Sequence, residues 1–339
     1  MNQIIIALAL IILPLFSDCC FVGLSTFTPG QFAREEKPRY AKEPITRKVL
    51  ILIYDPIISS KGNKKLHEIL RWNNPDTLAY RYIRDVHEAS WGIVNYMIVE
   101  QIELNEYPIH TDGYRYNDST FFIDWNRKRF YPQGGDYKAI IKEFDLVKRI
   151  ESKEIDEVWM FGAPGFGWWE SLMVGKGAYF CNSDPLTDID CNRRFVVMGF
   201  NYERGVDCML ENLGHRIESI LWHIYGTWEA NKNTSWNHFT LYDKNAPGQA
   251  QCGNIHFAPN STRDYEWGNP MYVMSGCDDW YSYPTLTGKI RRVNCEEWGN
   301  GDMRLHHIWW FKHLPRAEGL SDGKLNNWWQ YVMKVDEFD

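Results

Sequence analysis

Three polar side chains in the segment 206–225 have the types and the spacing of a metal site. Glu211, His215 and Glu218 follow one another at intervals of four and three residues, which places them on one face of a helix. Carboxylate oxygens and imidazole nitrogens suit zinc, and a catalytic zinc needs three protein ligands and one open position. The segment therefore predicts a metal-binding helix to which another part of the chain adds a ligand.

The added ligand is expected to be a histidine. His306 and His307 stand side by side in RLHHIWW and are the ligands that we favour, and His256, in CGNIHFAPN, is a further supplier. A purely structural helix stays open as the alternative, because the macrodipole stabilises a carboxylate near the front of a helix and Glu218 could pair with a nearby arginine.

Hydrolysis at such a site needs a base and a cation close to the metal. Glu203 and Glu218 are the candidates for the general base, and Arg204 is the candidate for stabilising a developing oxyanion. A bound zinc would lower the pKa of its water towards neutrality. The expected chemistry is therefore a metal-dependent hydrolysis.

The five-residue unit ENLGH at 211–215 weakly resembles the HExxH unit of the zinc-peptidase (zincin) helix. Gly214 and His215 match that unit, whereas Glu211 stands where the first His belongs and Asn212 where the catalytic Glu belongs. Residue 221 is Leu, so the third ligand of metzincins has no counterpart. The resemblance implies a zincin-like hydrolase of peptide or peptide–glycan substrates, whose water-activating carboxylate lies elsewhere.

Longer segments resemble a group of uncharacterised secreted proteins. The segments are EIDEVWMFGAPGFGWWES, GFNYERGVDCMLENLGHRIES and LNNWW. This resemblance covers most of the chain after residue 25. It implies one coherent domain, and it implies no activity.

Carboxylates beside tryptophans support a second hypothesis, a carbohydrate-active protein. Glycosidases use two carboxyl groups with sugar-stacking rings beside them, and the chain has 16 tryptophans. The expected substrate-binding residues are Trp168, Trp169, Asp278, Asp279 and Trp280, and Glu296 or Glu297 could complete an acid–base pair. Adjacent aspartates could also hold calcium. A non-catalytic protein that binds glycans or has an extracellular structural role is the third hypothesis.

The elements that must position these residues alternate between strands and helices. Strands are expected at 49–54, 94–102, 158–161 and 194–200, and helices at 75–89, 136–150 and 206–225. This order predicts an α/β fold with a mainly parallel central sheet flanked by helices. Ligands gather at the carboxyl ends of parallel strands, so we expect Asp55, the glycine loop 162–167 and residues 201–204 to meet at the start of the 206–225 helix.

The chain opens with a targeting segment. Residues 4–16 are an uninterrupted apolar run, too short to span a bilayer and placed as in a secretory signal. The expected organisation is a signal peptide at 1–25, a linker at 26–47 and one α/β domain at 48–339. A loop-rich, tryptophan-rich C-terminal half is expected to pack as a cap, at about 227–301. The mature chain is expected to be secreted and extracellular, without a membrane span.

In a secreted protein, the cysteines are expected to form disulfides. Six cysteines follow residue 25, and an even number in an oxidising compartment predicts disulfides. We expect Cys181 to pair with Cys191 and Cys277 with Cys295, while Cys208 is free or joined to Cys252. Sequons at Asn117, Asn233 and Asn260 fit a glycoprotein. The net charge of -7 argues against nucleic acid as a partner, so an extracellular peptide or glycan is expected.

Overall fold

The computed structural model describes residues 43–226 and 233–338, all of which belong to one compact unit, Pro38–Asp339. The expected signal peptide and most of the expected linker lie outside the described residues. The first strand, β1, begins at Ile45, so the last residues of the expected linker belong to the sheet. The expected boundary between the linker and the α/β domain, at residues 47 and 48, therefore falls inside β1.

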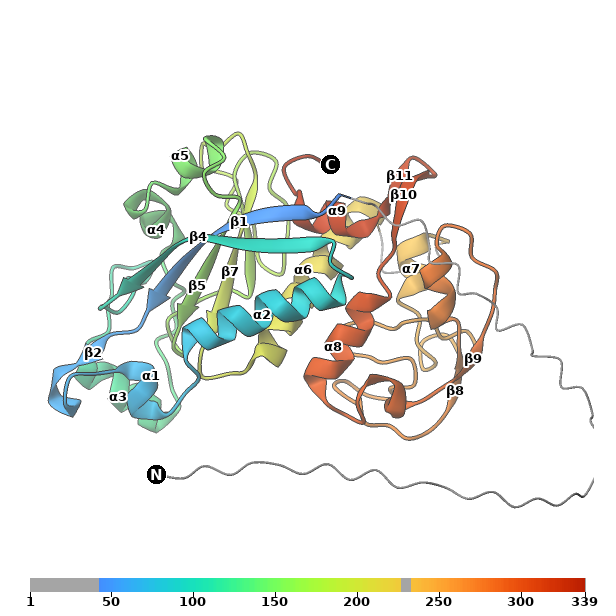
Figure 1. Ribbon diagram of the computed structural model, residues 1–339. Helices are drawn as coiled ribbons and strands as arrows, with labels where there is room; N and C mark the ends of the chain where they lie inside the picture. The colour runs from blue at the N-terminus through green and yellow to red at the C-terminus, as the bar shows by residue number, and fades with distance from the viewer. Residues whose placement is uncertain (1–42, 227–232, 339) are drawn as a thin grey trace, which may run out of the picture. The chain divides into compact units, whose positions relative to one another are not determined.

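A five-stranded sheet forms the centre of the molecule (Figure 1). Its order is β4 (Val94–Leu104), β1 (Ile45–Tyr54), β5 (Glu157–Gly162), β7 (Phe195–Asn201) and β6 (Ser171–Val174). All neighbours are parallel except β6, which runs antiparallel to β7. The central strands are apolar runs, because a strand covered on both faces has no polar side. The prediction of a mainly parallel sheet is confirmed.

Helices flank this sheet, as predicted. Helix α2 (Pro75–Ala89) packs on β4, α6 (Val206–Tyr225) on β6, and α9 (Trp328–Met333) on β1, and α6 contacts both α2 and α9. Helix α8 (Met303–Lys312) packs on α2 and α6. The remaining helices are α1 (Leu66–Leu70), α3 (Asp118–Arg127), α4 (Tyr137–Glu143), α5 (Leu146–Glu151) and α7 (Ser235–Phe239). The helix expected at 136–150 is therefore two helices, separated at Asp145, whose φ is +54°.

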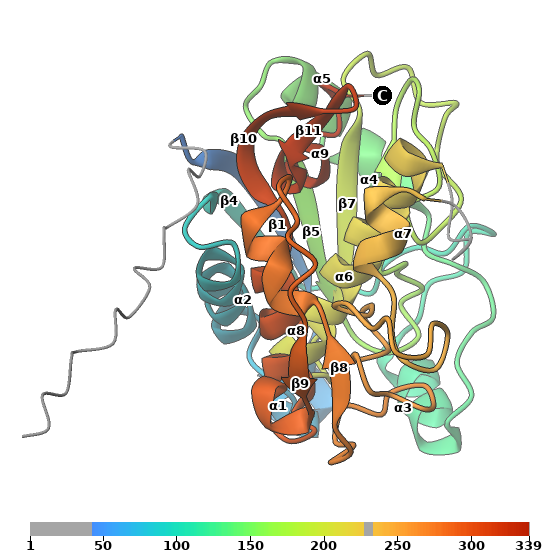
Figure 2. The same cartoon turned by 90° about the vertical axis from the view of Figure 1, so that its right-hand side faces the viewer.

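The segment from α7 to α8 has only short regular elements, and it lies beside α6 and α8 (Figure 2). Its strands are β8 (Val273–Ser275) and β9 (Arg291–Val293), and its 3₁₀ helices are η2 (Cys277–Ser282) and η3 (Cys295–Trp298). Two further strand pairs lie elsewhere: β2 (Ile57–Ile58) pairs with β3 (Lys64–Lys65), and β10 (Arg316–Ser321) pairs with β11 (Lys324–Asn327). The 3₁₀ helix η1 (Ser59–Lys61) lies between β2 and β3 in the chain. Across 43–226 and 233–338, no helix is both long and apolar enough to cross a membrane.

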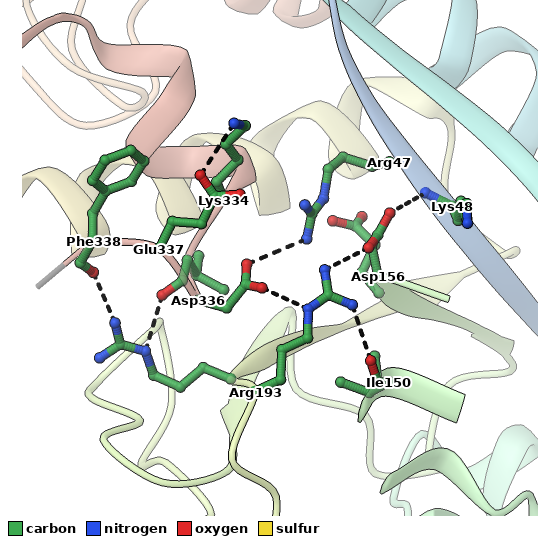
Figure 3. Close-up of polar contacts among 12 residues, drawn as sticks. Arg47, Lys48, Ile150, Asp156, Arg193, Lys334, Asp336, Glu337 and Phe338 are labelled. Carbon is green, nitrogen blue, oxygen red and sulfur yellow. Dashed lines mark hydrogen bonds and ion pairs between the residues drawn. The ribbon is translucent and has the colours of Figure 1, made fainter. Parts of the chain in front are cut away.

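A network of charged groups fastens the C-terminal segment to the sheet (Figure 3). Arg193 donates to Asp156 and to Asp336, at 2.6 Å in each case. Arg47 lies 3.9 Å from the second oxygen of Asp336, and the Lys48 amide donates to Asp156 at 2.8 Å. Because hydrogen bonds to charged groups are stronger than neutral ones, this network stabilises the contact between β1, the start of β5 and the C-terminal segment.

The pH dependence of stability should report on Asp156. Burial raises the pKa of this carboxyl, but Arg47, the Lys48 amide and Arg193 together hold that pKa below its ordinary value. Such a group stabilises the fold above its unfolded-state pKa of about 3.9, and the contribution is lost as pH falls through the folded-state pKa. The free energy of unfolding in urea should therefore fall less, between about pH 5 and about pH 3, in Asp156→Asn than in wild type.

A second aspartate serves as the control for this experiment. Asp322 lies on the exposed turn between β10 and β11, and Asp322→Asn should keep the wild-type dependence on pH. An Asp156→Asn protein that loses as much stability as wild type over the same interval would contradict the assignment.

Candidate metal centre

Helix α6 carries the candidate site on a face whose polar residues are buried or half-buried. Leu210, Leu213 and Ile217 are fully buried and attach the helix to the rest of the fold. The helix runs from the Gly205 N-cap to Gly226, whose left-handed conformation ends it. The polar residues at 211, 215 and 218 then lie along one face, as the spacing predicted.

Three possible ligand atoms converge beside this face. They belong to Glu211, His215 and His256, and they lie within 4.8 Å of one another. His256 Nε2 is 3.2 Å from His215 Nε2 and 3.2 Å from Glu211 Oε1. Two ligands of a tetrahedral zinc, each about 2.0–2.1 Å from the ion, are about 3.3 Å apart. Both distances therefore match the spacing of ligands that share one zinc.

Carboxylates on the far side hold both imidazole rings in place. His215 Nδ1 donates to Glu218 at 3.0 Å, and His256 Nδ1 lies 3.1 Å from Asp264. A ring whose Nδ1 carries the proton presents the lone pair of Nε2. Metal-binding histidines are oriented in this way by a carboxylate. Two such lone pairs at 3.2 Å repel each other unless a proton or a metal cation lies between them.

Charge at the site also favours a cation. Glu211 is 3% exposed; burial raises its pKa, but hydrogen bonds with His256 and Tyr265 hold that pKa below its ordinary value. Burial lowers the pKa of His215, whereas the hydrogen bond to Glu218 raises it, and the net shift is upward. Glu211 is therefore ionised at neutral pH, and its carboxylate would favour a cation at this face.

Gly214 allows the loop that carries His256 to reach the helix. A Cβ atom at position 214 would lie 2.3 Å from the Cδ1 atom of Ile255. The Ile255 amide donates to Glu218 Oε1 at 3.1 Å, so the loop is fixed directly over the helix. Glycine inside a helix costs about 0.5–1 kcal/mol relative to alanine, and here it permits the close approach that puts His256 beside His215.

A pocket of about 280 Å³ adjoins the cluster. Its walls come from the glycine loop after β5, the end of β7 and the first turns of α6, and the side chains that line it include Trp168, Glu170, Asn201, Arg204 and Asn212. Glu170 lines this pocket, and its Oε2 lies 3.9 Å from His215 Nε2. The glycine loop and residues 201 and 204 therefore meet at the start of α6, as expected, whereas Asp55 does not line the pocket and pairs with His67 instead.

The two histidines that were favoured as remote ligands, His306 and His307, lie outside the cluster on α6. Within the described residues, His306 and His307 are not part of the cluster of Glu211, His215 and His256. Both are 0% exposed, and their Nδ1 atoms lie 3.2 Å apart. Burial lowers the pKa of His306 to about 3, so both rings act as core side chains packed around Trp267. His256 instead lies beside His215, because its loop passes over α6.

Neither of the two expected general bases, Glu218 and Glu203, lines the pocket. Glu218 is 9% exposed, and its oxygens accept hydrogen bonds from His215 and from the Ile255 amide, so it orients the His215 ring. Glu203 is exposed and is not among the residues that line the pocket. Glu170, with 37% of its side chain exposed, is the carboxylate that faces both the cluster and the pocket.

The residues expected to bind sugars do not form one site. Asp278 is paired with Arg291, and Asp279 accepts hydrogen bonds from the Thr287 and Gly288 amides. Trp280 is 1% exposed. Asp278 and Asp279 therefore serve the local structure, and Trp280 belongs to the core. Of the tryptophan pair at 168–169, the first lines the pocket and the second is exposed.

No disulfide joins the six cysteines within the described residues, so the expected pairs are not formed in this structure. The buried Cys181 thiol contacts Ser171 Oγ at 3.5 Å, and the Cys191 thiol donates to the Arg193 carbonyl at 3.1 Å. Each of these thiols has a local polar partner instead of the other thiol.

One of the three sequons is inaccessible. Asn260 is 3% exposed, and its side chain donates to the carbonyls of Asn269 and Met271. Asn117 and Asn233 are exposed. Glycosylation of the folded chain would therefore be limited to these two positions.

Three contributors to the site had weak signals in the sequence. Glu170 directly follows the tryptophan pair at the end of the glycine loop, where a sheet-edge argument could have selected it. Asp264 and Tyr265 lie in a loop without periodicity. The Tyr265 ring packs against His256 at an angle of 38°, with ring centroids 4.3 Å apart, and Tyr265 has a φ of +58°. Such a conformation is strained for a non-glycine residue and is concentrated at functional sites.

Comparisons with protein-family models, with curated proteins and with solved structures find no match to this chain.

Proposed function

We propose that this protein is a secreted, zincin-like metal-dependent hydrolase of peptide or peptide–glycan substrates. The observation that carries the proposal is the convergence of three acceptor atoms, from Glu211, His215 and His256, at spacings that fit one zinc ion. The two imidazole rings are held by carboxylates, as metal-binding rings are. The apolar run at residues 4–16 supports secretion.

A bound zinc would supply an activated water and polarise the scissile carbonyl. Glu170 would accept the proton of the attacking water and return it to the leaving amine, because it faces both the cluster and the pocket. Arg204, on the wall of the same pocket, would stabilise the developing oxyanion. The pocket would take the substrate side chain next to the scissile bond.

The loop-rich, tryptophan-rich segment at about 227–301 would act as a cap in this enzyme. Its residues His256, Asp264 and Tyr265 reach the cluster on α6. A cap that supplies a ligand would complete the site only when it is in place. The proposal therefore assigns the cap a part in binding as well as in covering α6 and α8.

A carbohydrate-active role is the second candidate, and tryptophans at the pocket favour it. Trp168 lines the pocket and Trp169 is 55% exposed. Aromatic faces of this kind stack on sugars. In this version of the function, the pocket would hold a glycan or the glycan part of a peptide–glycan.

Metal content tests the leading proposal. Purified full-length protein is measured by plasma mass spectrometry beside His215→Ala and His256→Ala, and each variant should contain one zinc ion fewer per chain than wild type. The matched control is His223→Ala, an exposed position on the same helix, which should keep the wild-type zinc content.

Wild-type zinc content in both ligand variants would sink the metal assignment. Zinc loss together with chelator-sensitive cleavage of a quenched peptide library would support the peptidase. Zinc loss without peptide cleavage, together with release of sugars from a glycan array, would favour the carbohydrate-active alternative.

A further inference from the structure

A second group of possible ligands lies away from α6, where η2 meets the end of α8. Cys277, Asp278 and His313 each offer one ligand atom, and these atoms lie within 4.8 Å of one another. Cys277 begins η2, and His313 is the C-cap of α8. The group thus joins two segments that are separated by more than thirty residues.

The His313 ring is fixed with its free nitrogen towards the group. Its Nδ1 donates to the Trp309 carbonyl at 2.7 Å, so Nε2 presents a lone pair. The ring packs between Tyr281 and Trp309, with centroid distances of 4.6 and 4.4 Å. His313 is 2% exposed, and its Nε2 makes no hydrogen bond among the described residues, with the Asp278 carboxylate 3.8 Å away. A buried acceptor without a partner is costly, and a cation bound there would remove that cost.

The sulfur and oxygen atoms lie at distances that suit a shared ion. Cys277 Sγ is 3.6 Å from Asp278 Oδ1, and this oxygen is 3.8 Å from His313 Nε2. A thiolate and a carboxylate on one tetrahedral zinc are about 3.6 Å apart. The first distance matches that spacing, and the second requires a shift of a few tenths of an ångström.

Arg291 holds the carboxylate and leaves room for a metal. Its guanidinium donates to both oxygens of Asp278, at 2.5 and 2.9 Å, and also to Glu297. An ionised carboxylate has about four lone-pair positions, so this fork leaves an acceptor position on Oδ1. An outer partner that fixes a ligating carboxylate is a usual feature of metal sites.

We propose that Cys277, Asp278 and His313 bind a structural zinc ion, distinct from the ion at α6. A thiolate with an imidazole selects zinc and disfavours calcium and magnesium, which take oxygen ligands. Asp278 is half exposed, so a water can occupy the fourth position. Binding would release the thiol proton to solvent, and the ion would connect η2 to the end of α8.

Cobalt substitution of the full-length protein tests this proposal. Cobalt bound by a thiolate has a sulfur-to-metal charge-transfer band in the near ultraviolet, and the cluster at α6 contains no sulfur ligand. Wild type should bind two cobalt ions per chain and show the band. Cys277→Ser and His313→Gln should each bind one ion, and Cys277→Ser should lose the band. Cys295→Ser, at a buried cysteine outside the group, should keep it.

The same spectra separate this proposal from the one for α6. His215→Ala should keep the sulfur band and lose one ion, so the band in that variant supports the second site even if the hydrolase proposal fails. Wild-type protein without the band would overturn the proposal, and this result needs no variant to fold. Peptide mapping that finds Cys277 in a disulfide in the purified protein would also overturn it.

Discussion

Replacing Glu170 with Gln should lower the rate of peptide hydrolysis by about 10²–10⁴-fold, the range over which a general base contributes, and should leave the zinc content unchanged. Glu170 lies 3.9 Å from His215 Nε2 and also lines the pocket. Its side chain accepts a hydrogen bond from Asn182, and the carbonyl of Gln can keep that bond. The substitution therefore removes the base with little change in shape.

Glu203→Gln is the matched control for Glu170. Glu203 was a candidate base from the sequence, and the structure leaves it exposed and off the pocket wall. Its substitution should keep the wild-type kcat. Zinc content and kcat are measured together on both variants. If Glu203→Gln is the variant that loses activity, or if Glu170→Gln retains it, the assignment of the base to Glu170 is wrong.

The second large effect concerns the buried ion pair between α6 and β5. Arg216 donates to Glu157 at 3.0 Å and to the Val332 carbonyl at 2.8 Å, and both charged side chains are 1% exposed. The other oxygen of Glu157 accepts from Trp159 at 2.7 Å. Glu157→Gln would leave the Arg216 charge buried without its counter-ion. Breaking such a pair costs about 3–5 kcal/mol.

Urea unfolding of Glu157→Gln should therefore show a free energy of unfolding lower than wild type by about that amount. The control is Lys138→Met, which removes the exposed ion pair with Asp188 and should cost no more than about 1 kcal/mol. Equal losses in the two variants would contradict the account of Arg216 and Glu157 as a buried pair that depends on both charges. Wild-type zinc content in the folded fraction of Glu157→Gln would separate stability from ligand geometry.

Several features of the site follow from local sequence. The spacing of Glu211, His215 and Glu218 puts all three on one helix face, and the structure places them there because a helix repeats every 3.6 residues. The ends of β5 and β7 meet the start of α6 because parallel strands end on one edge of the sheet. Elements with strong periodicity were therefore predictable, and so was the meeting of the β5 and β7 ends with α6.

The choice among histidines was not predictable in the same way. His256, His306 and His307 all suited zinc by residue type. Their positions depend on packing. In α8, His306 and His307 lie in the core around Trp267, whereas the loop that packs on Gly214 places His256 beside α6. The loop has no periodicity from which its path could be inferred. Only its tertiary contacts determine that path.

The same division applies to the whole molecule. By itself, the sequence determined an α/β fold with a mainly parallel sheet and a helix whose polar face has ligand chemistry, because apolar periodicity is a local property. Only the tertiary structure decided that Glu218 orients His215, that Glu170 faces the pocket, and that Asp278 meets His313. These pairs are far apart in the sequence or depend on side-chain direction, and both are set by how the chain packs.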